Sequence, residues 1–506
     1  MMPMKRIGLS HIIIFCIWLS VSHAHAQISR LGNEVQYATT LQGTVASDDV
    51  APFWFTNNRY GLGTIEPNSG LLRATIQRPV EVDSLRHWRI GYGLDLVGAI
   101  NHDSHFIVQQ AYGDFQYKWL RLSVGQKERP MELRNQQLSS GGMTTGINAR
   151  PLPQVRLELP EFLTIPRTGN WLALKAHIAY GMLTDNRWQR HFTAGTNNIH
   201  TANSLYHSKA GFLRIGNKDR FPLTITGGLE MSCQFGGEVW NLNDREDHAD
   251  PNFQSHQKLS HGFKAFWHAL IPGGSDVNDG DFSNVEGNQL GSWHLRADFD
   301  HHGWGVSFYA EHFFEDHSQM FWEYPWKDML YGAELRFPRN PVCSTIVYEH
   351  LRTTHQSGPI YHDGTAAMPE HIYGIDNYYN HHIYGAWQHA GFALGHPLLL
   401  SPIYNENGNI AFRDNRVRAH HIGLEGQPTQ EISYRLLYTH ECSWGTYSNP
   451  RTNPAKGRYL LVEASYAPHQ VPGLSFTAAY GQNNGSLLGD SKGAMLSITY
   501  TGLLKK

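Results

Sequence analysis

The sequence has few cysteines, no surplus of either charge and no long hydrophobic run beyond its first residues. Four cysteines occur in 506 residues. The three that follow the N-terminal segment, Cys233, Cys343 and Cys442, are an odd number and lie far apart, so they predict no disulfide framework. A formal net charge of −3 at pH 7 provides neither the basic surface that nucleic acid requires nor an acidic tail. We therefore expect no nucleic-acid partner.

An export signal accounts for the apolar N-terminus. Lys5 and Arg6 precede the apolar run of residues 12–19, and Ala24-His25-Ala26 has the small-x-small pattern of a cleavage site. We expect residues 1–26 to be a signal peptide, cleaved near Ala26-Gln27, and residues 27–506 to form one domain. No later apolar stretch approaches the roughly 20 residues that a membrane-spanning helix needs.

Two-residue periodicity is the strongest pattern in the rest of the chain. Apolar residues occupy every second position of residues 293–299 and 304–310, and His301-His302-Gly303 separates the two runs, which predicts a hairpin. The same alternation occurs in residues 37–45, 89–96, 172–180, 460–466, 474–481 and 494–500. The sequence therefore predicts an all-β fold built of long antiparallel strands.

The residues between the apolar positions distinguish a membrane barrel from a soluble sandwich. They are mostly Gly, Ser, Thr and isolated charges, whereas a sandwich would present many Lys and Glu to water. Aromatic residues such as Trp171, Trp293, Trp304 and Tyr500 lie near strand ends, where an interfacial girdle would place them. We predict a transmembrane antiparallel β-barrel in the outer membrane, in contact with outer-membrane lipid.

Connections of two lengths alternate along the chain. Residues 338–341, 427–430 and 471–473 resemble tight turns, whereas long loops are expected over residues 126–170, 241–291, 312–328 and 352–417. Apolar residues at i, i+3, i+4 and i+7 predict a two-turn helix over residues 263–270, inside the second long loop. Long extracellular loops are where barrels of this class carry function.

Aromatic and amide side chains within these loops are the candidate binding residues. Sugar rings present apolar faces that stack on aromatic rings, while amides and carboxylates hydrogen-bond the hydroxyls. The alternative is that the same rings pack a plug inside the lumen. The candidate carbohydrate contacts are Trp322, Tyr324, Trp326, Asp376, Asn377, Tyr378, Tyr379 and Trp387.

Signatures of catalysis and metal binding are weak. The pairs His301-His302, His381-His382 and His420-His421 have adjacent side chains that point apart on a strand and cannot chelate one ion. There is no nucleophile elbow of the Gly-x-Ser-x-Gly type. We expect no metal, no cofactor and no catalytic residues, and a barrel hydrolase with a dispersed site remains the enzymatic alternative.

One motif resembles a known family. Asn148, Ala149, Arg150, Pro151 and Pro153 match the Asn-Ala-Arg-Pro-x-Pro segment of the Wzi-type capsule assembly family. Residues 54–61, 284–293 and 374–380 are also similar to segments of family members. The resemblance spans most of the chain, although family members carry a helical periplasmic segment where residues 37–45 already alternate like a strand.

The resemblance implies a barrel of about 18 strands with long, partly plugging extracellular loops. It implies a lectin without enzymatic activity that binds capsular or other surface polysaccharide and helps its assembly or attachment, with capsule export machinery as a candidate partner. A diffusion channel for small polar or sugar solutes is the alternative. Its lining would be the inward-pointing charges Asp95, Arg296, Asp298, Glu311, Glu334, Arg336, Arg435 and Glu463.

Overall fold

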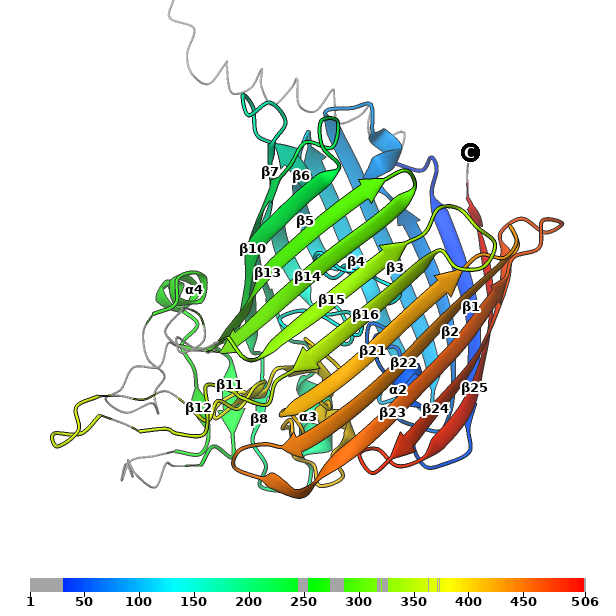
Figure 1. Cartoon of the computed structure of the whole chain (residues 1–506). Helices are drawn as coiled ribbons and strands as arrows, with labels where there is room; N and C mark the ends of the chain where they lie inside the picture. Colours follow the sequence, from blue (N-terminus) through cyan, green and yellow to red (C-terminus); the bar gives the residue numbers. More distant parts are fainter. Residues whose placement is uncertain are drawn as a thin grey trace, which may run out of the picture.

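Eighteen antiparallel strands form a closed barrel in the computed structural model (Figure 1). The structure describes residues 31–243, 254–273, 286–315, 320, 326–362, 364–370, 372 and 374–504. The predicted fold class and the strand number implied by the resemblance are thus confirmed. The expected signal peptide, residues 1–26, lies outside the described residues.

Each strand pairs with its neighbour along the chain, and β1 closes the ring by pairing with β25. The first nine barrel strands are β1 (Gln36–Ala46), β2 (Asn68–Arg78), β3 (Trp88–Ile100), β4 (Phe106–Tyr117), β5 (Leu120–Gln126), β6 (Pro153–Thr164), β7 (Leu172–Met182), β9 (Leu205–Ile215) and β10 (Leu223–Phe235). The other nine are β13 (Asn288–His301), β14 (Trp304–Glu315), β15 (Met329–Arg336), β16 (Thr345–Arg352), β21 (Val417–Gly426), β22 (Ile432–Gly445), β23 (Pro450–Tyr466), β24 (Leu474–Gly485) and β25 (Ser491–Leu503).

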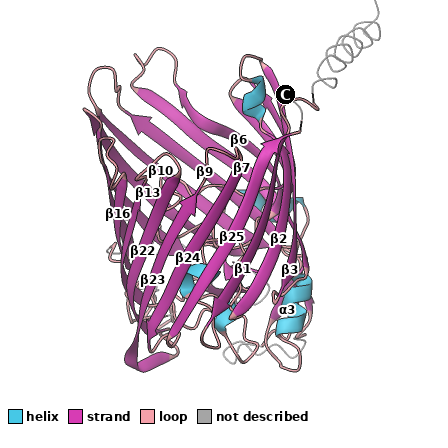
Figure 2. Cartoon of the chain, turned by 90° about the vertical axis from the view of Figure 1, so that its right-hand side faces the viewer, coloured by secondary structure: helices cyan, strands magenta, loops and turns pink. Residues whose placement is uncertain are grey.

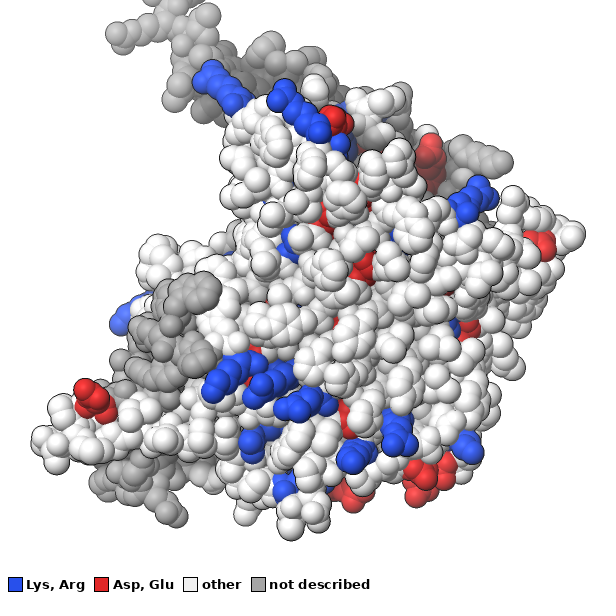
Figure 3. All heavy atoms as spheres, in the orientation of Figure 1, with Lys and Arg blue, Asp and Glu red and all other residues white. Residues whose placement is uncertain are grey.

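The outer face of the barrel is an apolar belt. Leu41, Leu72, Leu295 and Leu496 are each more than half exposed, although they belong to regular strands whose alternate residues face inward. A continuous exposed apolar surface of this kind is stable in lipid and not in water. Figure 3 shows the largely uncharged middle of one face, with charged side chains toward the two ends. The barrel is therefore of the outer-membrane type.

The two ends of the barrel differ in their connections. The tight turns predicted at residues 338–341, 427–430 and 471–473 all lie at the end where β1 begins and β25 ends. The long connections, residues 47–67, 127–152, 183–204, 236–287 and 353–416, lie at the opposite end, and Figure 2 shows α3 (Asn186–Phe192) there. This asymmetry is typical of outer-membrane barrels, whose long loops face the exterior.

One loop prediction was wrong. Residues 126–170 were expected to be a single loop, but β6 occupies Pro153–Thr164 in the middle of them. Val155 and Leu157 are 53% and 41% exposed on the outer face, so the strand does alternate. Pro151, Pro153 and Pro160 hide the pattern, because proline is usually a sign against a strand.

The long loops fold back into the barrel and fill it. A large cluster of buried apolar side chains joins α2 (Phe53–Thr56), the loop of residues 127–152 and the loop of residues 353–416 to inward-facing wall residues. Smaller elements within the connections are η1 (Val80–Asp83), β8 (His200–Ala202), β11 (Glu238–Trp240), β12 (Gln257–Lys258), α4 (Phe263–Leu270), β17 (Asn380–His381), β18 (Gly385–Ala386), β19 (Gln388–His389), β20 (Phe392–Ala393) and η3 (Pro402–Tyr404). The helix predicted at residues 263–270 is confirmed as α4. No helix within the described residues is long and apolar enough to span a membrane.

Candidate functional site

Two loops distant in sequence are tied together inside the lumen. Trp387 is fully buried, and its Nε1 donates a hydrogen bond of 2.9 Å to the carbonyl oxygen of Thr144. The hydroxyl of Tyr379 donates to the carbonyl oxygen of Met143 next to it. We call the loops of residues 127–152 and 353–416 together the plug.

Buried charges fix the plug to the wall. The guanidinium of Arg134, in the first plug loop, contacts the carboxylates of Glu311 on β14 and Glu349 on β16, and all three side chains are at most 2% exposed. Burial opposes the charge on Arg134, but the two carboxylates outweigh it and raise its pKa above the ordinary value. Ser139 and Tyr309 each donate to Glu349 across 2.6 Å. The ions are thus matched and hydrogen-bonded, which a buried charge requires.

The other charges that were candidates for a channel lining also have partners. Asp95 accepts from Arg73 at 2.9 Å, and Arg435 lies 2.9 Å from Glu463. Arg296 pairs with Asp298 and Glu334 at 2.8 and 3.2 Å. The side chains that the sequence offered as a channel lining therefore pair across the wall or hold the plug.

The Asn-Ala-Arg-Pro-x-Pro motif of residues 148–153 connects several loops. Asn148 is fully buried, and its Oδ1 accepts from the backbone N–H of Asn58 at 2.9 Å while its Nδ2 faces the carbonyl oxygen of Ala393 at 3.3 Å. Gly61 donates to the carbonyl oxygen of Asn148 and has a φ of +67°, with no room for a Cβ beside Arg150. Pro153 begins β6. These contacts join the loop of residues 47–67 to both plug loops.

Three of the predicted carbohydrate contacts are fully buried inside the plug. Tyr378, Tyr379 and Trp387 have no measurable exposure, and Phe313 packs edge-on against both tyrosines. In this structure the three rings hold the plug together and no solvent reaches them. Their contact with carbohydrate stays a prediction.

The remaining predicted contacts are dispersed. Trp326 stacks on His312 at 4.3 Å between centroids, at the rim of the outward face of β14. Asp376 accepts from the hydroxyl of Ser357, and the Asn377 Oδ1 accepts from Asn380 at 2.8 Å. Trp322 and Tyr324 lie outside the described residues.

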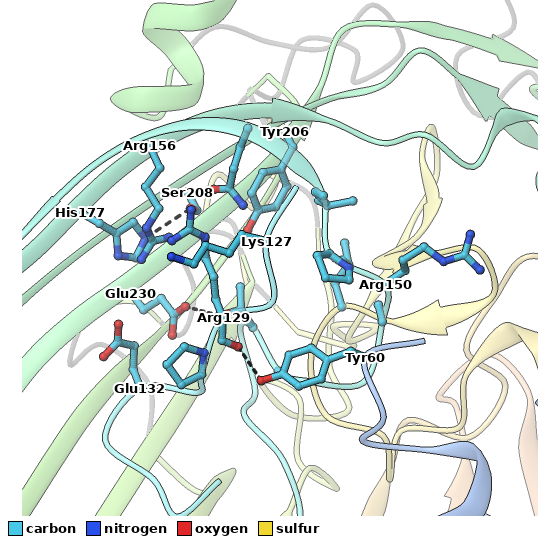
Figure 4. Close-up of a pocket in the computed structure, with 18 residues that line it drawn as sticks. Tyr60, Lys127, Arg129, Glu132, Arg150, Arg156, His177, Tyr206, Ser208 and Glu230 are labelled. Carbon is cyan, nitrogen blue, oxygen red and sulfur yellow. Dashed lines mark hydrogen bonds between the residues drawn. The ribbon is translucent and has the colours of Figure 1, made fainter. Parts of the chain in front are cut away.

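A small charged cavity lies between the first plug loop and the wall (Figure 4). It measures about 90 Å³, and Arg129, Arg156 and His177 gather on one side of it, as the close-up shows. A neighbouring cavity of about 180 Å³ shares these residues. Glu158 accepts from Arg156 at 2.6 Å and lies 3.4 Å from Arg129. One carboxylate therefore offsets only part of the charge of two guanidinium groups, and burial lowers the pKa of Arg129 to about 10.

A large cleft opens among the long loops. It measures about 910 Å³ and is lined by residues of the connections after β7, β10, β16, β22 and β24. Nine asparagines line it: Asn197, Asn198, Asn243, Asn377, Asn380, Asn405, Asn407, Asn409 and Asn449. We call it the amide cleft. An amide side chain carries two N–H donors and an acceptor oxygen, so this surface is suited to a ligand rich in hydroxyls.

Internal hydrogen bonds preorganise part of the amide cleft. Asn405 donates to the carbonyl oxygen of Asn409 at 2.7 Å. Asn198 donates to the carbonyl oxygen of Asn407 at 3.0 Å, across two different loops. Arg451 makes a two-point contact with Asp414 at 2.6 and 2.7 Å. Arg413 and Asn449 are exposed and available to a ligand.

Sequence reasoning found only one residue of the amide cleft, Asn377. The other asparagines come from loops far apart in the chain. The predicted aromatic contacts Tyr378, Tyr379 and Trp387 pack the plug. No group of three His, Cys, Asp or Glu side chains that could hold a metal ion occurs in the part of the chain that the structure describes. In the sequence, the clustering of asparagine over residues 405–409 is the feature that could have indicated the amide cleft.

No family model matches the sequence. No curated protein matches it either. Among solved structures, the chain is similar to Wzi, described as an outer-membrane protein involved in group 1 capsule assembly in Escherichia coli and as a carbohydrate-binding β-barrel. The TM-score is 0.55 at 15% identity, over 96% of this chain and 88% of that one. Pseudomonas aeruginosa OccD3 (OpdP) also matches, with a TM-score of 0.45 at 11% identity, over 94% and 92% of the two chains. The resemblance to Wzi that the sequence motif indicated is confirmed at the level of the fold.

Proposed function

We propose that this barrel binds capsular or other surface polysaccharide in the amide cleft and helps to attach it at the cell surface, without catalysis. The observation that carries the proposal is the cleft itself. It is a wide opening on the long-loop side, and asparagine is the most frequent residue in its lining.

The chemistry of the lining fits a glycan. Each sugar hydroxyl both donates and accepts, and asparagine side chains can serve both roles. Arg413 adds a fixed positive charge that would favour a polysaccharide bearing carboxylates. Many weak hydrogen bonds, some of them mediated by water, can together retain a long polymer on a wide surface.

The fold similarity to Wzi supports this proposal, since that protein is described as a carbohydrate-binding barrel of capsule assembly. The shared motif around Asn148 supports it indirectly, because it joins the loops that shape the mouth. Attachment through contact with export machinery would require a surface at the short-turn end, and it belongs to the same proposal.

A glycan array with purified protein tests the binding step. The triple variant Asn409→Ala, Arg413→Ala, Asn449→Ala changes cleft side chains without removing a hydrogen bond of the loop framework described above. We expect the parent to bind a set of surface polysaccharides and the variant to lose at least about tenfold in affinity, corresponding to about 1.4 kcal/mol. Arg339→Ala, at a short turn of the opposite end, is the matched control.

Equal binding by the parent and the triple variant would contradict the location of the site. Absence of binding to every polysaccharide of the producing cells would contradict the function.

A further inference from the structure

The helix α4 lies on the outside of the barrel wall. Its residues Ala265 and Ala269, each 1% exposed, pack in one cluster with Cys233 and Phe235 of β10. Residues of a strand alternate between its two faces, and Cys233 and Phe235 share a face with Ile225, which is 43% exposed. The opposite face of β10 points to the plug, since Thr145 donates to Glu230. Figure 1 accordingly shows α4 beside the wall and not within the barrel.

The outer face of the wall beneath α4 carries polar side chains. Lys209 shares the outward face of β9 with Leu213 and Ile215, which are 40% and 48% exposed. The ring of His207, two residues away on that face, is fully buried and lies 4.5 Å from the ring of Tyr180. A lysine and a histidine facing lipid are costly.

The backbone of α4 accepts hydrogen bonds from Lys209 and Tyr180. The Nζ of Lys209 donates to the carbonyl oxygens of Ala269, at 3.3 Å, and of Leu270. A cation at this end of a helix also compensates its exposed carbonyl groups. The hydroxyl of Tyr180 donates to the carbonyl oxygen of Phe266 at 2.9 Å. The helix therefore covers polar side chains on this part of the wall.

The side of α4 that faces away from the wall is apolar. Phe263 and Trp267 are 86% and 50% exposed, and their spacing of four residues places them on one face of the helix. Ile271, directly after the helix, is 52% exposed. They continue the lipid-facing belt formed by wall residues such as Leu213 and Leu295. Lys264, also exposed, can extend its ammonium group toward the polar head groups.

We propose that α4 is an interfacial helix embedded in the leaflet on the long-loop side, with Phe263, Trp267 and Ile271 in contact with lipid. The covered patch explains why the helix is held to the wall, and continuity with the belt identifies lipid as the occupant of its outer face. The helix thereby anchors the loop of residues 236–287 at the membrane surface, at one edge of the mouth.

Spin labels test this placement. Trp267→Cys is introduced into full-length protein carrying Cys343→Ser and Cys442→Ser, labelled, and folded into vesicles of dilauroylphosphatidylcholine. Collision rates with oxygen and with a water-soluble nickel chelate are measured. The wall position Leu213→Cys serves as the lipid control, and the mouth position Asn197→Cys serves as the water control.

We expect the label at position 267 to favour oxygen over the nickel chelate about as strongly as the label at 213, and at least about tenfold more than the label at 197. A nickel accessibility equal to that at 197 would overturn the proposal. So would a label-to-label distance distribution that shows position 267 buried between two copies of the chain. The assay is independent of glycan binding, so its outcome leaves the proposed function unaffected.

Discussion

Trp387 and Thr144 are 243 residues apart in the sequence, yet the indole Nε1 donates to the carbonyl oxygen of Thr144 across 2.9 Å inside the barrel. This bond joins the two plug loops at a point where neither is exposed to solvent. A lumen filled by such contacts cannot also provide a wide, permanently open path. We therefore expect the lumen to be closed, whereas the channel alternative requires an open one.

Planar-bilayer recordings test the closed lumen. We expect the parent protein to show no steady open-channel current. Replacing residues 353–416 by a short Gly-Ser linker should produce stepwise conductance, because β16 and β21 are neighbours and the wall can close without the loop. A steady current through the parent would favour the diffusion channel.

The buried charge group predicts a large loss of stability for Arg134→Met. Glu311 and Glu349 would remain buried without their counter-ion, which costs about 3–5 kcal/mol. The free energy of unfolding in urea, measured on vesicle-embedded protein, reports the change. Arg336→Met is the control, since Arg336 is 44% exposed beside Asp300 and Glu334 and should cost less than about 1 kcal/mol. Equal losses in the two variants would contradict the anchoring role.

Asn148→Ala should loosen the joint between loops. The backbone N–H of Asn58 would lose its acceptor inside the protein, at a cost of about 1–3 kcal/mol. Proteolysis of folded protein in vesicles should become faster in residues 47–67, while the exposed Asn197→Ala should leave the rate unchanged. An unchanged cleavage rate for Asn148→Ala would show that the motif does not hold the loops.

Asp328 predicts a pH dependence. Burial raises the pKa of its carboxyl to about 6, above the value of about 3.9 in an unfolded chain. The folded state therefore binds this proton more tightly, so the contribution to stability is complete below about pH 4 and is lost as the pH rises through 6. The shift of about two units corresponds to about 3 kcal/mol.

The measurement compares urea unfolding of the parent and Asp328→Asn at pH 4.5 and 7.5. The variant should lack the part of the pH dependence that Asp328 contributes. Identical pH profiles for the two proteins would contradict the raised pKa.

The barrel could be predicted from the sequence because its signal is local. The alternation in residues 293–299 and 304–310 and the His301-His302-Gly303 turn give the β13–β14 hairpin directly, with His301 opposite Trp304. β6 was missed where three prolines interrupt the pattern. Strand periodicity depends only on neighbours in the chain, so one sequence suffices for most of the wall.

The interior could not be predicted in the same way. Arg134, Glu311 and Glu349 meet only because the plug loop enters the lumen at a particular depth, and nothing in their spacing indicates it. The burial of Trp387 and Tyr379 could not be predicted either, because composition cannot distinguish a ring in a plug from a ring at a mouth. The amide cleft likewise depends on five connections meeting at one end.

Retention of polysaccharide by living cells tests the central claim most directly. In cells that make this protein, the gene is deleted and then restored as the parent or as the triple variant Asn409→Ala, Arg413→Ala, Asn449→Ala. Cell-bound and released polysaccharide are then quantified, with equal barrel levels in the outer membrane as the requirement for comparison. The account predicts that deletion releases the polymer, that the parent restores its attachment and that the cleft variant does not. Unchanged retention in the deletion strain would contradict it.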